Sequence, residues 1–294
     1  MKLIDSETTW FFVSGSDEER FLDDIAFGIQ CLLYRGVSLE NIFLFVDNPG
    51  NINLSDFYPF PEEVTVETTD KIRSRITAID CSNLAIVVTG HGCEYGIAAS
   101  SNISPYKLLE IIKSNTNLKY ALVVLGQCFA GTFNFLEARS KDRATGEVIS
   151  PEICIVGATD LTFSISVTVS IADQEIVKEF DCPKEWLANL FLFFFMYHIA
   201  LPIDIDGDDK LTVIDTYKIA GILTNSRLRD MKQKAFISLQ ETLLTSTLSQ
   251  LTEGEIAKRL AEKAKQDLAN TLNIILTNQN FWILNANLSR KLEL

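Results

Sequence analysis

The sequence is poor in the residues on which several classes of function depend. It has 26 Lys and Arg against 39 Asp and Glu, and the formal net charge of −13 without a basic stripe argues against a nucleic-acid-binding protein. None of the six cysteines forms a Cys-X-X-Cys pair, which disfavours a zinc ribbon or a disulfide framework. No GxGxxG or Walker loop follows an apolar run, so a nucleotide-binding module has little support.

Signals for export and for membrane insertion are also lacking. The first residues, MKLIDSETTWFF, are acidic where a signal peptide has a basic flank ahead of its apolar stretch. The most apolar segment runs from Trp186 to Leu201, contains Asn189 and His198, and is shorter than the roughly 20 residues of a membrane span. We therefore expect a buried core helix there, no membrane span and a cytoplasmic protein.

A regular alternation of apolar runs and helical patterns is present instead. The runs of strand length are TWFFV, NIFLFV, LAIVVTG, YALVVLG and ICIVG. Ser16 and Glu19 have the spacing of a capping box that begins one helix, and Ser104 is placed to begin another. This alternation predicts an α/β fold, a mostly parallel central sheet flanked by helices. We expect residues 1–224 to form the main domain and residues 225–294 a mainly helical extension, either a separate cap or packed on the same core.

Two of the predicted strands end alike, on a reactive side chain next to glycine. NLAIVVTGHG places His91 at its end, and KYALVVLGQC places Cys128. Because the carboxyl ends of parallel strands meet at one edge of a sheet, we expect the imidazole and the thiol to lie together. An imidazole can accept the proton of a thiol, and the thiolate can then attack a carbonyl carbon. The backbone N–H groups of Gly92 and Cys128 are candidate donors to the resulting oxyanion.

Each of these residues also has a simpler interpretation. Cysteine in a protein is most often a buried, inert thiol, which is the alternative for Cys128. We adopt this interpretation for Cys31, Cys81, Cys154 and Cys182. His91 and Cys93 could ligate a metal, but no second ligand pair with suitable spacing accompanies them. The only other histidine, His198, lies in an apolar helical pattern where packing is the default role. If a cysteine and a histidine act together here, the histidine is His91.

At these motifs the sequence resembles the caspase-like superfamily of cysteine peptidases, and within it the branch of legumains and GPI transamidases. The similar segments are the opening unit Trp10–Asn48, the pair His91 and Gly92, and QCFAG at Gln127–Gly131, within about the first 220 residues. The resemblance implies a caspase-like sandwich, a protein or peptide substrate, and an acyl-enzyme intermediate. His91 is implied as general base and acid, and Cys128 as nucleophile.

The resemblance also implies residues of the substrate pocket. Arg20 stands where the family has an arginine near the start of its first helix, and Ser164 lies in the segment that lines the primary pocket. Cleavage after Asp or Asn follows if Arg20 enters that pocket, whereas a surface role would pair it with Asp23 or Asp24. Glu18 replaces the asparagine that orients the histidine in legumains, and a carboxylate turned into the pocket would favour Lys or Arg instead.

Three activities stay open at this stage. The first is a cysteine endopeptidase, the second a transamidase or ligase in which an amine resolves the same acyl-enzyme, and the third a caspase-like pseudoenzyme that serves as a scaffold. The polar, basic loop from Ser140 to Ser150 is a candidate site for self-processing or limited proteolysis, and a regulatory partner is a further expectation.

A second motif, DIDGDDKLTVID, has oxygen-bearing side chains at the places that bind calcium in a twelve-residue loop. It resembles a dockerin-like loop, with Asp at the last place and with Asp209 at the sixth place, where glycine is usual. The alternative is an acidic turn whose last residues cap the next helix. The thiol mechanism needs no cofactor, so calcium here would have a structural or regulatory role. The candidate ligands are Asp204, Asp206, Asp208, Thr212 and Asp215.

Overall fold

The computed structural model describes two compact units of the chain. The described residues are 1–47, 64, 66–138, 141, 144–147, 151–171, 185–250 and 255–294. One unit consists of residues 1–221 together with 279–294, and the other of residues 222–278. The first unit contains the central sheet and every residue of the candidate active site, whereas the second consists of helices.

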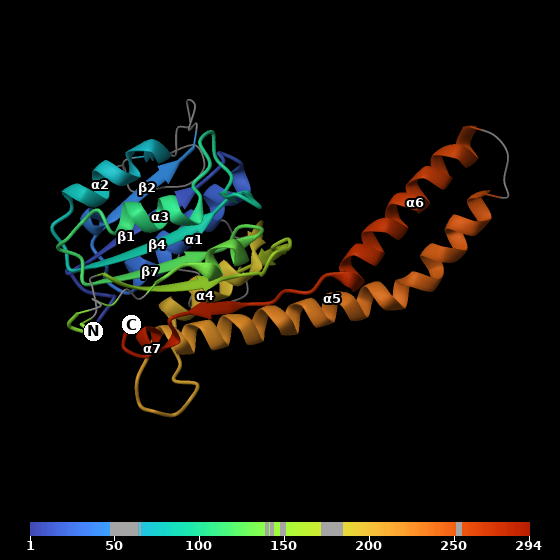
Figure 1. The fold of residues 1–294 in the computed structure, drawn as a ribbon. Helices are drawn as coiled ribbons and strands as arrows, with labels where there is room; N and C mark the ends of the chain where they lie inside the picture. The colour runs from blue at the N-terminus through green and yellow to red at the C-terminus, as the bar shows by residue number, and fades with distance from the viewer. Residues whose placement is uncertain are drawn as a thin grey trace. The chain divides into compact units, whose positions relative to one another are not determined.

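A seven-stranded mixed sheet is the centre of the first unit (Figure 1). Its strand order is β11-β8-β7-β4-β1-β2-β3, and all neighbouring strands are parallel except β11 and β8. The five predicted strands therefore form the middle of a mostly parallel sheet, as expected. The strands are β1 (Thr8–Ser14), β2 (Ile42–Val46), β3 (Val66–Thr68), β4 (Asn83–Thr89), β7 (Tyr120–Leu125), β8 (Glu152–Gly157) and β11 (Trp282–Leu284).

Alternate side chains of the strands enter two separate apolar layers. On β1, Trp10 and Phe12 belong to one layer, while Phe11 and Val13 belong to the other. The helices α1 (Glu19–Tyr34) and α4 (Leu190–Ala200) cover the first layer, and α2 (Ile72–Ala78) and α3 (Pro105–Ile112) cover the second. This double cover explains why the central strands read as continuous apolar runs instead of alternating ones.

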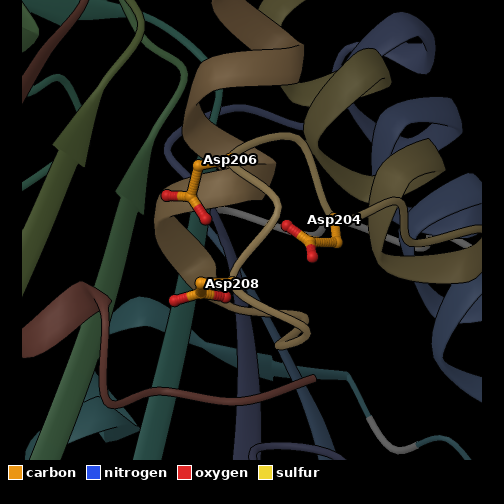
Figure 2. A group of neighbouring side chains, drawn as sticks. All are labelled: Asp204, Asp206 and Asp208. Atoms are coloured by element: carbon orange, nitrogen blue, oxygen red, sulfur yellow. The ribbon is translucent and has the colours of Figure 1, made fainter.

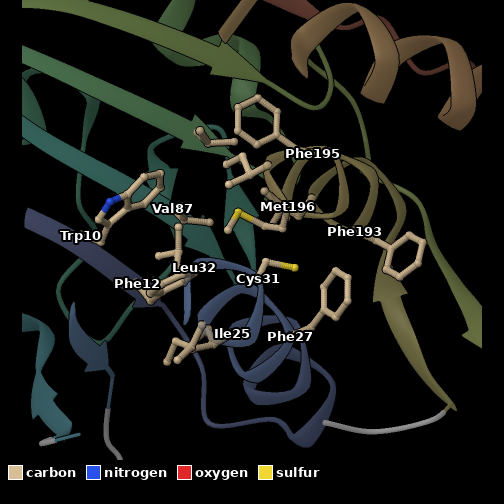
Figure 3. Close-up of a cluster of buried hydrophobic side chains, with 14 of the residues drawn as sticks. Trp10, Phe12, Ile25, Phe27, Cys31, Leu32, Val87, Phe193, Phe195 and Met196 are labelled. Carbon is tan, nitrogen blue, oxygen red and sulfur yellow. The ribbon is translucent and has the colours of Figure 1, made fainter. Parts of the chain in front are cut away.

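The layer under α1 and α4 is rich in aromatic side chains. The rings of Phe27 on α1 and Phe193 on α4 stack with centroids 5.0 Å apart. Fully buried aromatic groups contribute much of the hydrophobic stabilisation of such a core. Figure 3 shows the cluster, with side chains from the sheet, α1 and α4: Trp10, Phe12, Ile25, Phe27, Cys31, Leu32, Val87, Phe193, Phe195 and Met196.

The helix boundaries agree with the sequence at some positions and differ at others. Ser104 caps α3, because its hydroxyl accepts the N–H of Lys107 at 3.3 Å. The capping box predicted at Ser16 is wrong, since the N-cap residue of α1 is Glu18. The predicted core helix in the apolar segment from Trp186 to Leu201 is α4. The first residues of that segment, before α4, belong instead to a strand, β10 (Glu185–Asn189), which pairs with β9 (Ser166–Ser170). Among the described residues, no helix has the length and apolarity to cross a membrane.

The second unit contains most of α5 (Val213–Gln250) and all of α6 (Glu255–Leu276). The expected extension over 225–294 is therefore divided, because residues 279–294 return to the first unit. There β11 pairs antiparallel with β8 and the short α7 (Ala286–Ser289) follows. Among the described residues the remaining short elements are the hairpin β5 (Gly92–Cys93) and β6 (Gly96–Ile97), and the 3-10 turns Leu39–Asn41, Thr69–Lys71 and Ala130–Phe135.

Candidate active site

His91 and Cys128 follow neighbouring parallel strands at the same edge of the sheet. In the register of β4 and β7, Val88 is opposite Leu125, and the N–H of Gly126 donates to the carbonyl of Val88 at 2.9 Å. His91 and Cys128 each stand three residues beyond that matched pair. The prediction that the two strands are neighbours is therefore confirmed, and both side chains start from the same level of the sheet.

Gly92 lies directly against the backbone of Cys128. A methyl group at Gly92 would lie 2.8 Å from the carbonyl carbon of Cys128, closer still to its oxygen, and 2.6 Å from the Cγ atom of Gln127. These separations are shorter than side-chain carbons adopt in proteins. Glycine is thus required for the close approach of the two motifs, independently of any freedom in its φ angle.

Two side chains of the α1 region hold the His91 ring. Its Nε2 atom is hydrogen-bonded to Glu18 Oε1, and the ring meets that of Phe21 edge to face with centroids 5.1 Å apart. Glu18 also accepts from Arg20 Nε at 2.9 Å. The hydrogen bond with His91 is the main cause of a lowered pKa at Glu18, with Arg20 adding to it. Glu18 therefore contacts both the ring of His91 and the guanidinium group of Arg20.

Cys128 is held by the segment after β8. The N–H of Ser164 donates to Cys128 Sγ at 3.3 Å. The next residue, Phe129, has a left-handed backbone with φ of 56°, and its N–H donates to the carbonyl of Thr162 at 2.8 Å. A non-glycine residue in this conformation costs free energy and is held by its surroundings. The chain therefore turns sharply straight after the thiol.

The side-chain hydrogen bonds of the described residues include none between His91 and Cys128. His91 is instead bonded to Glu18 and Cys128 to Ser164. Catalytic hydrogen bonds are often long in a free enzyme and tighten when substrate binds, so this separation is compatible with a pair. The oxyanion role of the Gly92 and Cys128 N–H groups stays a prediction.

The two residues expected in the substrate pocket lie at different parts of this edge. Ser164 is next to the thiol, to which its backbone N–H donates, and its role in the substrate pocket stays a prediction. Arg20 lies on the His91 side, with its guanidinium carbon 4.2 Å from the centroid of the Phe21 ring. Its ion pair is with Glu18, so the alternative of pairing with Asp23 or Asp24 is wrong.

Three polar residues near the site were not singled out from the sequence. Asn189 donates its amide to the carbonyl of Gly126 at 2.6 Å and to Ser164 Oγ at 2.9 Å. Gln279, in the returning C-terminal segment, donates to the same hydroxyl at 3.2 Å. Asp24 is a buried carboxylate on α1. The asparagine inside an otherwise apolar run is the one signal of this contact in the sequence.

Gln127, immediately before the thiol, is another unusual residue. It is buried, and among the described residues neither its amide nitrogen nor its amide oxygen has a hydrogen-bond partner. Buried polar groups are nearly always paired, so an unpaired one requires a functional or structural reason. The Cγ atom of Gln127 lies beside Gly92, so the side chain is at the contact between the two motifs.

The remaining cysteines and histidine fit their structural interpretations. Cys31, Cys81 and Cys154 are buried, and Cys182 lies outside the described residues. His198 is buried, with Nδ1 bonded to Thr216 and Nε2 accepting the N–H of Ile203 at 2.9 Å. No metal cluster that includes Cys93 occurs among the described residues. Most of the predicted self-processing loop from 140 to 150 also lies outside them.

A cavity of about 400 Å³ is present along another part of the same edge. Its wall includes Asp47 after β2 and Arg73 and Lys107 from the covering helices. None of the predicted catalytic or pocket residues lines it. The cavity therefore lends no support to the candidate active site, which rests on the contacts around His91 and Cys128.

The predicted calcium ligands fall into two groups. Figure 2 shows Asp204, Asp206 and Asp208 around one space inside the loop before α5, and their oxygens lie within 4.8 Å of one another. Thr212 and Asp215 are buried at the start of α5, where Asp215 Oδ2 accepts the N–H and the hydroxyl of Thr212. The second group thus has the capping role of the alternative interpretation.

The two groups still contain features that suit a cation. Asp215 Oδ1 is buried without a hydrogen-bond partner among the described residues. Asp209, at the sixth place, has φ of 63°, the backbone conformation for which calcium loops use glycine. Against this, Lys218 Nζ already contacts Asp206 Oδ2 at 2.6 Å and neutralises part of the acidic charge.

No protein-family model matches this sequence, and no curated protein matches it either. The function must therefore be inferred from the residues of the site and from the fold that positions them.

Proposed function

We propose that this chain is a cysteine endopeptidase with a caspase-like sandwich fold, most similar to the legumain and GPI-transamidase branch. The observation that supports the proposal is the contact of Gly92 with the backbone of Cys128 at the carboxyl edge of β4 and β7. It brings the histidine motif and the cysteine motif together at the edge where open α/β sheets bind ligands.

The proposed reaction begins with proton transfer from Cys128 Sγ to His91. Glu18 holds Nε2 of the ring, which leaves Nδ1 to accept this proton. The thiolate attacks the carbonyl carbon of the scissile peptide and forms an S–C bond. The tetrahedral oxyanion accepts hydrogen bonds from the N–H groups of Gly92 and Cys128.

Collapse of the tetrahedral intermediate breaks the C–N bond, and the imidazolium gives its proton to the departing amine. His91 then takes a proton from water, whose oxygen attacks the acyl-enzyme carbonyl. The S–C bond breaks, the carboxyl product leaves, and the thiol is protonated again. If an amine attacks in place of water, the same residues perform transamidation, which is the alternative activity.

In the proposed pocket, Ser164 and Arg20 flank the residue that precedes the cut. Ser164 adjoins the thiol. Arg20 uses Nε to contact Glu18, so its two terminal nitrogens remain for a side chain that accepts hydrogen bonds. Asp or Asn before the cut fits this arrangement.

We also propose one structural calcium ion in the Asp204–Asp215 loop. Oxygen ligands suit calcium, and the carboxylates of Asp204, Asp206 and Asp208 provide them. Asp215 Oδ1, which has no hydrogen-bond partner among the described residues, is a candidate for a further ligand. Binding requires Asp206 to exchange its contact with Lys218 for the ion. Cytoplasmic localisation and a regulatory partner stay predictions.

The function is tested with a mixed peptide library, incubated with and without calcium and analysed by mass spectrometry for cleaved bonds. The intact protein should cut, whereas Cys128→Ala and His91→Ala should not. Cys93→Ala is the matched control, because Cys93 is a partly exposed thiol near the site. Products joined to an added amine would assign transamidation, and no cleavage by any variant would favour the pseudoenzyme alternative.

A further inference from the structure

Asp24 is a buried carboxylate that joins α1 to two other elements behind the candidate site. Its Oδ2 accepts from the hydroxyl of Thr89 at 3.1 Å. Its Oδ1 accepts from Trp186 Nε1 and from the backbone N–H of Asn189, both at 3.1 Å. All three partners donate, so both oxygens of the Asp24 side chain act as acceptors here.

The first partner, Thr89, connects Asp24 to the strand that ends near the histidine. Thr89 is the last residue of β4 and stands two residues before His91. Because Thr89 is buried, its bond with Asp24 fixes the end of the strand against α1. Glu18, which holds the His91 ring, precedes the same helix. The strand and the ring are therefore both anchored to α1.

The second partner, Asn189, connects Asp24 to the segment that contains the thiol. Its backbone N–H donates to Asp24, and its side-chain oxygen caps α4 by accepting the N–H of Leu192. Its side-chain amide then donates to the carbonyl of Gly126, two residues before Cys128, and to Ser164 Oγ. Asp24 is thus two hydrogen bonds from the strand that ends at the nucleophile.

We propose that Asp24 is a positioning residue that sets the histidine strand, the cysteine strand and the Ser164 segment relative to one another. Its effect on catalysis rests on the proposed peptidase function, whereas its effect on the placement of the thiol does not. A static error of about 1 Å between reacting groups can cost an enzyme about a hundredfold in rate, so such a link is valuable at this site.

The cost of placing a carboxyl here supports a specific role. Burial raises the pKa of Asp24 from 3.8 to about 7, even though the hydrogen bonds from Trp186, Thr89 and Asn189 lower it. Burial raises the pKa of the neighbouring Asp23 to about 7 as well, so the hydrogen bonds of Asp24, and not its pKa, carry the proposal. The next residue along the helix, Asp23, offers a matched control. It is also buried, and among the described residues it forms no hydrogen bond to either motif strand.

The test compares Asp24→Asn with Asp23→Asn in the full chain. Two readouts are taken: kcat and KM for a cleaved peptide, and the rate at which iodoacetamide alkylates Cys128, located by peptide mapping. We expect Asp24→Asn to lower kcat about 10- to 100-fold with little change in KM, and to slow alkylation of Cys128. Asp23→Asn should change both rates by less than about threefold.

Thr89→Val and Thr89→Ser keep the test decisive if Asp24→Asn does not fold. Removing the hydroxyl should lower kcat and slow alkylation, while serine should restore both. Unchanged rates in Asp24→Asn and Thr89→Val, or equal losses in Asp23→Asn, would overturn the proposal. If the unmodified chain cleaves nothing but Asp24→Asn still slows alkylation, the peptidase function fails and the positioning role stands.

Discussion

Replacing Gly92 by alanine tests whether the contact between the two motifs matters for chemistry. The new methyl group would lie 2.8 Å from the carbonyl carbon of Cys128, which must retreat by about 0.6 Å to reach the ordinary limit of 3.4 Å. The carbonyl oxygen is closer and must move further. Because a displacement of about 1 Å can cost about a hundredfold in rate, we expect cleavage to fall 10- to 100-fold.

The fold should survive this change, since overpacking typically costs about 1–3 kcal/mol. Thermal unfolding monitors stability, and peptide cleavage together with alkylation of Cys128 monitors the site. Gly221→Ala is the control, because the atoms nearest to its methyl group would be those of the Phe281 ring, at 3.3 Å and beyond. Wild-type cleavage in a folded Gly92→Ala protein would refute the inferred contact.

Three further predictions concern charged side chains. Because burial raises the pKa of Asp24 from 3.8 to about 7, the folded chain binds the proton of this carboxyl more tightly than the unfolded chain does. The resulting stabilisation is complete below pH 4 and is lost as the pH rises through 7. Between pH 5 and 8 the free energy of unfolding, from urea titrations, should fall by about 2–3 kcal/mol more in the intact protein than in Asp24→Asn; parallel pH profiles would contradict this. Calcium should raise the melting temperature of the intact protein by several degrees and leave the Asp206→Asn, Asp208→Asn double variant unchanged, whereas an equal shift would place the ion elsewhere. Arg20→Ala should reduce turnover of Asp and Asn peptides selectively, while an equal fall for all peptides would assign Arg20 to support of Glu18 alone.

The parallel sheet and the pairing of its reactive strands could be predicted because their signals are local. Continuous apolar runs such as Asn83–Thr89 and Tyr120–Leu125 mark strands buried on both faces. The glycine and the reactive side chain that follow each run mark the carboxyl edge. The position of His91 next to the cysteine motif then follows from the topology of any parallel pair.

The features that the sequence did not reveal depend on contacts between distant residues. β11 is three residues long and pairs with β8 across more than a hundred positions, so no local pattern predicts it. Asp24 and Asn189 acquire their roles only when α1 and α4 are packed together. The capping box at Ser16 failed because Glu18, which also binds His91, begins the helix instead.

The most direct test of the Cys128 and His91 pair is the mass-mapped site of a covalent adduct. The protein is treated with a peptidyl acyloxymethyl ketone carrying Asp or Asn next to the reactive group, digested, and sequenced by mass spectrometry. The account predicts one adduct, on Cys128, that disappears in His91→Ala. An adduct on Cys93, or labelling of Cys128 at an unchanged rate without His91, would contradict it.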